Sequence, residues 1–216
     1  MEKYLKAILE DTGETLESNI NSFIERKNGE IWVSGNVLCK LDIKDHLLTV
    51  RKVDIAVTSP GSLFEDKKQN VWMAKGEEGV YQLTPDNQLT LHLSKDNGYV
   101  KSICEDQRGN IYVGSIRKGL FIYEKERKTF VPVDLKEKGE LPVCFLYSGI
   151  PNELYIGTDG KGVAIYNIRT HEISEYKFDN NYFDSGNSKI HSILKDNSGN
   201  LWLAVYQKGV ILIPAR

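Results

Sequence analysis

The sequence lacks both a long apolar segment and an excess of charge of one sign. No stretch reaches the roughly 18–20 apolar residues that a helix needs to cross a bilayer, and residues 1–20 carry no apolar core typical of a signal peptide. Lys and Arg number 28 against 30 Asp and Glu, and the basic residues are scattered. We therefore expect no nucleic-acid partner and no direct membrane insertion of this chain.

Cysteine is scarce, and motifs that carry catalysis are absent from the sequence. The three cysteines, Cys39, Cys104 and Cys144, lie far apart among apolar neighbours, which predicts buried free thiols. The sequence contains no G-x-S-x-G, no H-E-x-x-H and no glycine-rich phosphate loop followed by Lys, and its four histidines occur in unrelated contexts. We therefore predict no catalytic residue, no metal site, no cofactor and no enzymatic activity.

What the sequence does contain is one unit repeated along nearly the whole chain. The repeats align on an aromatic residue at steps of 40, 40, 43 and 47 residues. A serine stands ten residues before the aromatic in every repeat except the fourth. The five anchors are Trp32, Trp72, Tyr112, Tyr155 and Trp202, in the phrases "NGEIWVSG", "QNVWMAKG", "GNIYVGSI", "NELYIGTD" and "GNLWLAVY".

Each unit divides into four short strands separated by turn signals. In the third repeat we expect strands at 102–105, 111–114, 120–123 and 128–133, with a tight turn at 106–110 whose glycine supplies a positive φ. No helical stretch separates the strands, so a βαβ arrangement is excluded. Four strands in 40–47 residues is the period of a β-propeller blade. The sequence predicts an all-β propeller of five four-stranded blades.

The ends of the chain suggest how such a propeller would close. The fifth repeat supplies three strands, and "KYLKAIL" at residues 3–9 precedes the first repeat, so we expect 3–9 to complete the last blade as its outer strand. This predicts a single domain over residues 1–216. Its repeats span approximately 20–54, 60–94, 100–134, 141–178 and 190–216.

Two recurring residue types are interpreted as structural. The anchoring aromatics are expected to pack between blades, and Asp66, Asp106 and Asp196, which recur beside the hairpin turn, are expected to bond the turn backbone.

The third repeat, "SICEDQRGNIYVGSIRKGLFIYEKERKTF", resembles the two-component regulator propeller repeat, and residues 15–35 resemble the approach to such a blade. In that family the repeats form extracytoplasmic sensors of bacterial hybrid two-component systems, common in Bacteroides-type bacteria, that respond to oligosaccharides. The resemblance implies a periplasmic, non-catalytic, carbohydrate-sensing propeller. This chain departs from the pattern in having five repeats and none of the other domains, in a shortened first repeat at 34–38, and in a fourth repeat without Gly-Asn.

Ligands are expected on the face formed by two sets of loops, those between second and third strands and those leading into the next blade. Lys118, Lys161 and Lys208 hold equivalent loop positions, either as solvated lysines or as donors to an anionic ligand. Loop aromatics suit stacking on sugar, or equally serve as buried anchors. The predicted ligand-binding residues are Tyr99, Arg117, Lys118, Asp159, Lys161, Tyr182, Phe183, Tyr206 and Lys208.

We therefore expect a recognition module of a two-component system that binds an oligosaccharide and transmits a conformational or dimerisation signal, with a second copy or a signalling-kinase domain as its partner. One alternative is a protein-interaction scaffold. A less favoured alternative is a propeller glycosidase or lyase, which would need a carboxylate pair roughly 5–9.5 Å apart.

Overall fold

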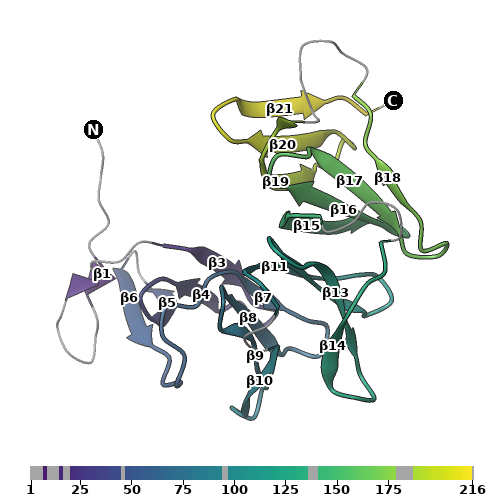
Figure 1. Ribbon diagram of the computed structural model, residues 1–216. Helices are drawn as coiled ribbons and strands as arrows, with labels where there is room; N and C mark the ends of the chain where they lie inside the picture. Colours follow the sequence, from purple (N-terminus) through teal and green to yellow (C-terminus); the bar gives the residue numbers. More distant parts are fainter. Residues whose placement is uncertain are drawn as a thin grey trace. The chain divides into compact units, whose positions relative to one another are not determined.

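The structure, a computed structural model, describes residues 7–8, 15–16, 20–44, 47–93, 97–135, 141–178 and 187–215. The regular elements in this part of the chain are β-strands, and it contains no α-helix (Figure 1). The described part also contains no helix with the length and apolar character needed to span a bilayer.

The strands form five antiparallel sheets in chain order, here called blades 1 to 5. Blade 1 consists of β3 (Ser22–Glu25), β4 (Ile31–Ser34), β5 (Leu38–Lys44) and β6 (Leu47–Lys52). Blade 2 consists of β7 (Leu63–Glu65), β8 (Val71–Lys75), β9 (Gly79–Leu83) and β10 (Leu89–Leu93). Blade 3 consists of β11 (Val100–Glu105), β12 (Ile111–Ser115), β13 (Gly119–Glu124) and β14 (Thr129–Pro132). Blade 4 consists of β15 (Val143–Ile150), β16 (Glu153–Thr158), β17 (Val163–Asn167) and β18 (Ile173–Glu175). Blade 5 consists of β19 (Ile190–Lys195), β20 (Leu201–Val205) and β21 (Gly209–Ile213).

The predicted all-β propeller class is confirmed, with each blade a simple up-and-down meander. The chain divides into two compact units, the first formed by residues 1–75 and 81–90 and the second by residues 76–80 and 91–216. The boundary falls inside blade 2. The second unit holds blades 3, 4 and 5, and the candidate site lies there.

The turn after the first strand of each blade explains the recurring aspartates. Oδ1 of Asp106 accepts hydrogen bonds from the backbone N–H groups of Arg108 and Asn110, at 2.8 and 2.9 Å, and Gly109 has a φ of 79°. Asp66 and Asp196 make the same backbone contacts in blades 2 and 5. Asp and Asn favour turns because their side chains bond nearby backbone in this way. The turn interpretation of these carboxylates is therefore confirmed.

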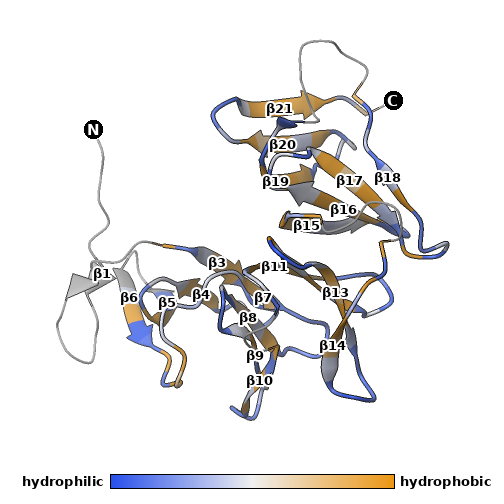
Figure 2. Ribbon diagram, in the orientation of Figure 1, coloured by the Kyte–Doolittle hydropathy of each residue, from blue (hydrophilic) through white to orange (hydrophobic). Residues whose placement is uncertain are grey.

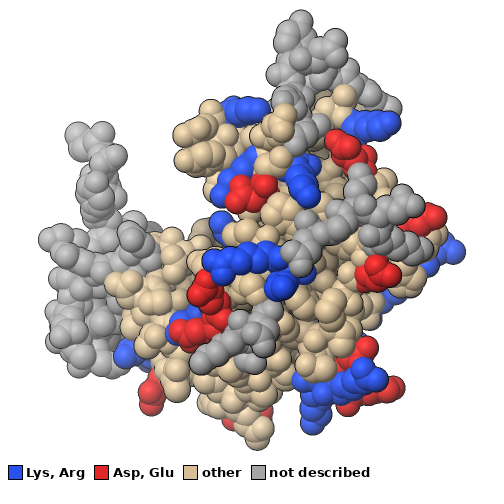
Figure 3. Space-filling model, viewed as in Figure 1, with Lys and Arg blue, Asp and Glu red and all other residues tan. Residues whose placement is uncertain are grey.

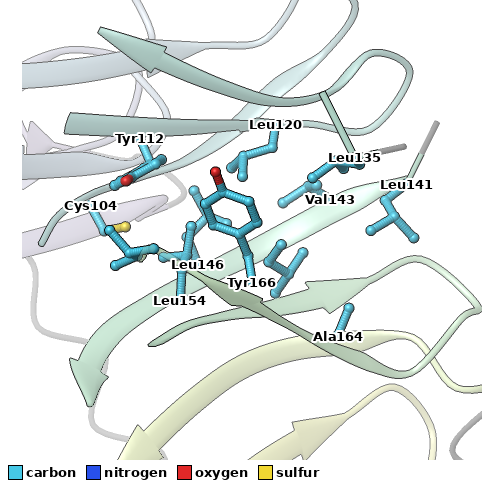
Figure 4. Close-up of a cluster of buried hydrophobic side chains, with 12 residues drawn as sticks. Cys104, Tyr112, Leu120, Leu135, Leu141, Val143, Leu146, Leu154, Ala164 and Tyr166 are labelled. Atoms are coloured by element: carbon cyan, nitrogen blue, oxygen red, sulfur yellow. The ribbon is translucent and has the colours of Figure 1, made fainter. Parts of the chain in front are cut away.

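Apolar side chains pack between successive blades of the second unit. One cluster joins blades 3 and 4, and in it Tyr112 meets Tyr166 edge to face, with ring centroids 6.5 Å apart (Figure 4). A second cluster joins blades 4 and 5 around Ile190 and Leu203. Figure 2 shows the same division along the chain, with hydrophobic residues on the strands and hydrophilic residues in the loops. Burial of these faces is the main favourable contribution to the fold.

The anchoring aromatics pack as predicted in four of the five blades. Trp32, Trp72, Tyr112 and Tyr155 are buried. In blade 5 the expectation is wrong, because Trp202 is 38% exposed. It shares an exposed sheet face with Leu194, Val210 and Leu212, and no described residue of the second unit covers this face.

The expected closure of the last blade also differs from the structure. Blade 5 has three strands among the described residues. The described part of 3–9 is β1 (Ala7–Ile8), which pairs antiparallel with β2 (Thr15–Leu16) instead of with β21. The remaining residues of 3–9 lie outside the described part of the chain. The local pairing closes only a short loop and so costs less conformational entropy than pairing across the chain.

Candidate functional site

The first strand of each blade in the second unit is interrupted by a β-bulge at the same repeat position. The pairing register shifts between Val100 and Ser102 in β11, between Val143 and Phe145 in β15, and between Ile190 and Ser192 in β19. The residues within these shifts are Lys101, Cys144 and His191, each eleven residues before the anchoring aromatic of its blade. We call these three residues the bulge row. A bulge takes its residue out of the hydrogen-bonded ladder and re-aims its side chain.

The loop after the second strand of each blade is tied to the segment that leads into the same blade. Ile116 N donates to Tyr99 O at 2.9 Å, Asp159 N donates to Pro142 O at 2.8 Å, and Tyr206 N donates to Lys189 O at 3.0 Å. These bonds hold the two sets of loops together at the end of each blade that carries the bulge. The rigid sheets therefore present both sets on one face, as the sequence suggested.

Tyr206 is the centre of the cluster at blade 5. Its side chain is 54% exposed, and its hydroxyl has no hydrogen-bond partner among the described residues. The His191 ring lies 5.5 Å from it between centroids, and Lys189 Nζ lies 5.9 Å from its centroid. Lys189 Nζ also donates to Oδ2 of Asp159, in the neighbouring loop of blade 4, at 3.0 Å. An open aromatic face is thus bordered by an ammonium, an imidazole and a carboxylate.

The charges of this cluster act on one another. Desolvation lowers the pKa of His191, Lys101 and Lys189 lower it further, and Asp159 opposes them. The hydrogen bond to Asp159 raises the pKa of Lys189. Burial raises the pKa of the Cys144 thiol, so this cysteine stays protonated and is no activated nucleophile. Lys101 itself makes no hydrogen bond or ion pair with the described residues.

The other predicted loop residues lie on the same set of loops, with partners of their own. Arg117 Nη1 contacts Oε1 of Glu77 at 2.8 Å, with both side chains well exposed, and Lys208 Nζ contacts Oγ of Ser188 at 3.0 Å. Tyr99 is 43% exposed and lies against Gly76, where an added Cβ would come within 3.0 Å of its ring.

The backbone N–H groups of Lys118 and Lys161 donate to Ser115 Oγ and Thr158 Oγ1, which shapes the two loops alike. Tyr182 and Phe183 fall outside the described residues. The assignment of all nine residues to a ligand site stays a prediction.

Three residues of the cluster, Lys101, Lys189 and His191, escaped the prediction from sequence. Lys101 and His191 occupy inner strands, where a loop-based search does not look, and Lys189 stands one residue before such a strand. The sequence did contain a signal for two of them. Lys101 and His191 occupy the same repeat position, and each is a polar residue within a mostly apolar strand.

A hollow of about 460 Å³ lies at the end of blades 4 and 5 that is opposite the Tyr206 cluster. Its walls are mostly apolar and include Tyr155, Tyr176, Phe178 and Leu201. The rings of Tyr176 and Phe178 pack with their centroids 4.9 Å apart, so packed aromatic rings form part of its wall. Lys177 and Lys195 are its charged members.

The described residues hold no group of three or more His, Cys, Asp or Glu side chains arranged to bind a metal ion. Figure 3 shows basic and acidic side chains interspersed on the visible face, which agrees with the formal net charge of −2.

The chain is similar to known proteins at two levels. Residues 94–117 and 184–207 match the family described as the two component regulator propeller. In blades 3 and 5 these two segments contain the residue just before the first strand, the bulge in that strand, and the start of the loop after the second strand. None of the curated proteins compared with the chain matches it.

Solved structures with a similar fold come from several bacteria. The extracellular domain of a hybrid two-component system from B. thetaiotaomicron is 14% identical with a TM-score of 0.63, covering 90% of this chain and 33% of that one. A catalytically inactive virginiamycin B lyase from Staphylococcus aureus is 15% identical with a TM-score of 0.68, covering 92% and 71%. PorZ, a surface component of the type-IX secretion system of Porphyromonas gingivalis, is 14% identical with a TM-score of 0.72, covering 99% and 34%.

These likenesses show the fold alone, and the chain spans about a third of the length of the B. thetaiotaomicron domain. Together with the two matched segments they confirm the resemblance read from the third repeat. The chain is a β-propeller protein in which two segments match the two component regulator propeller family.

Proposed function

We propose that this chain is a non-catalytic, extracytoplasmic recognition module of a two-component signalling system, and that it binds an oligosaccharide on the loop face of its second unit. The observation that carries the proposal is the half-exposed ring of Tyr206, bordered by Lys189, His191 and Asp159. An open aromatic face suits the apolar C–H face of a sugar, while the surrounding charged and polar groups suit its hydroxyls.

The hollow at the other end of the blades fits a sugar less well. Its aromatic rings pack on one another, and its polar side chains are limited to two lysines and two tyrosines. A polyhydroxylated ligand needs several hydrogen-bond partners, because each hydroxyl that loses water without a replacement costs free energy.

Signal transmission would follow from the position of the site across two blades. The Lys189–Asp159 ion pair joins blade 5 to the loop of blade 4, so a ligand that contacts both residues acts on the junction between them. A ligand shifts a conformational equilibrium only as far as it binds the two states differently. The receiving partner would be a kinase-linked domain or a second copy of the chain, and the proposed location is the periplasm, which the extracellular relatives support.

The test is calorimetry and thermal shift of the full chain against a panel of neutral and acidic oligosaccharides. Binding at 100 times the dissociation constant stabilises the folded state by about 2.7 kcal/mol, which such a shift detects. Tyr206→Ala is expected to weaken binding at least tenfold, whereas Tyr206→Phe keeps the ring and most of the affinity. Phe23→Ala removes an exposed ring of the first unit and serves as the matched control. Unchanged affinity of Tyr206→Ala contradicts this site.

The protein-interaction alternative has one observation in its favour, the exposed apolar face of blade 5. Trp202, Val210 and Leu212 hold the positions that the next blade covers at the earlier junctions of the second unit, so the occupant with matching chemistry is another blade of the same repeat. Light scattering of the purified chain at increasing concentration tests this role. A ligand-independent assembly that Trp202→Lys abolishes favours it, and a monomer at all concentrations opposes it.

A further inference from the structure

We propose that the bulge row, together with Lys189 and Tyr206, makes the site selective for acidic oligosaccharides, with a sugar carboxylate binding between Lys101, Lys189 and His191. This inference rests on the proposed function and names the ligand class of the same site. The bulge row belongs to inner strands, whereas the family resemblance and the loop pattern pointed to loop residues alone.

The bulges bring side chains from three successive blades to one place. β15 packs against β11 and against β19, and the three bulges occur at one repeat position. The positive charge of Lys101 lowers the pKa of both Cys144 and His191, which stand on different blades, in keeping with this placement. Cys144, on the middle blade of the three, is small and buried and adds no charge to the row.

The cluster has more positive than negative charge. Lys101 and Lys189 contribute two ammonium groups and Asp159 one carboxylate, and Lys101 has no partner among the described residues. Two cations beside one anion attract a further anion, and the attraction is strongest where water is partly excluded. The other basic loop residues are less available, since Arg117 pairs with Glu77 and Lys208 contacts Ser188.

The Lys189–Asp159 pair shows that this place already accommodates a carboxylate. The Asp159 Oδ2 atom lies 3.0 Å from Lys189 Nζ, and both side chains are about one-third exposed. Ion pairs of that exposure contribute only about 0–1 kcal/mol, so a ligand carboxylate can share or replace Asp159 at little cost. The centroid of the exposed Tyr206 ring lies 5.9 Å from Lys189 Nζ, and this ring would hold the sugar that carries the carboxylate.

His191 makes the selectivity depend on pH. The groups that act on it are Lys101 from β11, Lys189 from its own lead-in segment, Asp159 from blade 4 and the Tyr206 ring, with Cys144 in the adjacent bulge. A ligand carboxylate favours the protonated imidazole, so binding takes up a proton from solvent and raises the pKa of His191. Affinity for an acidic ligand is therefore expected to rise as pH falls from about 7.5 to 5.5.

The experiment is calorimetry on the full chain with uronate oligosaccharides of three linkage types, each paired with its own methyl ester. The ester keeps the size and hydroxyls of the sugar and removes only its charge. We expect one acid to bind at least about tenfold more tightly than its ester, with an advantage that shrinks between 0.05 and 0.5 M salt. His191→Gln should remove the pH dependence of acid binding, and it should weaken binding of the acid more than binding of its ester.

Two matched variants separate this site from general charge. Lys101→Gln is expected to weaken binding of the acid about fivefold or more, and binding of the ester by clearly less. Lys195→Gln removes the same charge from the far end of β19 and is expected to change neither. Equal loss in both variants overturns the proposal, because the preference would then follow overall charge.

The same titrations distinguish failure of the selectivity proposal from failure of the proposed recognition function. If acid and ester bind equally, or if only neutral oligosaccharides of the wider panel bind, the selectivity proposal is overturned and the recognition function stands. If no acidic or neutral oligosaccharide binds at all, both are overturned.

Discussion

The indole Nε1 of Trp72 donates a 2.8 Å hydrogen bond to Oδ2 of Asp66, six residues earlier in the same blade. The same pair recurs in blade 5 between Trp202 and Asp196, also at 2.8 Å. One carboxylate therefore orders the hairpin turn through Oδ1 and fixes the anchoring indole through Oδ2. This dual role explains why Asp and the aromatic repeat together.

In blade 1 the anchoring indole has a different hydrogen-bond acceptor. Arg26 stands at the position of Asp66, and Trp32 Nε1 donates instead to Oε2 of Glu30 at 3.0 Å. The Arg26 guanidinium lies 4.5 Å from the Trp32 ring centroid and pairs with Glu65 at 2.9 Å. The degenerate first repeat thus keeps its indole bonded and covered.

The first prediction concerns Asp66. Asp66→Ala leaves the Trp72 indole, the Asn70 amide and two backbone N–H groups without their acceptor in a buried site. We expect a loss of about 2–3 kcal/mol in the free energy of unfolding, measured by urea titration. Asp196→Ala removes the same bonds where Trp202 is open to water, so its loss should be clearly smaller. Equal losses would contradict the proposed difference.

The second prediction compares the two tryptophans themselves. Trp72 is 1% exposed, and Trp72→Ala should destabilise the chain by about 3–5 kcal/mol. Trp202 buries much less of its surface, so Trp202→Ala should cost well under half of that. Chemical denaturation at one pH measures both. A Trp202→Ala loss as large as that of Trp72→Ala would show that the face of blade 5 is covered in solution.

The repeats were predictable because their signals are local. The strand, the turn Asp, the glycine and the aromatic lie close together in the sequence, so the pattern from Ser102 to Val133 predicted every strand of blade 3. The exposure of Trp202 was not predictable, because the repeat pattern in blade 5 is the same as in the other blades. Only the packing against a neighbouring blade differs. The Lys189–Asp159 pair escaped for a related reason, since it joins residues 30 positions apart on different blades.

The third prediction concerns acid. Desolvation lowers the pKa of His92 below its usual 6.5, and its Nδ1 lies 3.0 Å from the Lys128 carbonyl oxygen. The unfolded chain therefore binds a proton that the folded chain resists, and the free energy of unfolding falls as pH drops below about 6.5. His191 contributes in the same direction. Urea midpoints at pH 7.5 and 5.5 measure the fall, which should be smaller in His92→Gln. If His92→Gln loses as much stability between these two pH values as the original chain, other groups control the acid sensitivity.

The fourth prediction links packing between blades to the site. An added Cβ at Gly157 would lie 2.8 Å from Cγ2 and 3.0 Å from Cβ of Ile190, so the methyl group of Gly157→Ala must push β19 away. Ile190 immediately precedes the bulge residue His191. Overpacking of this kind costs about 1–3 kcal/mol, and displacement of the bulge should also weaken oligosaccharide binding. Denaturation and calorimetry on the same variant measure the two effects.

Gly160→Ala is the control for this variant. Its Cβ would meet nothing within 4 Å, although its φ of 90° is unfavourable for alanine. It therefore strains the loop without moving Ile190. If both variants lose stability but only Gly157→Ala loses affinity, contact between blades positions the bulge row. If Gly157→Ala keeps full affinity, the site does not depend on how closely β19 approaches blade 4, and transmission of a signal through that junction would lose its physical basis.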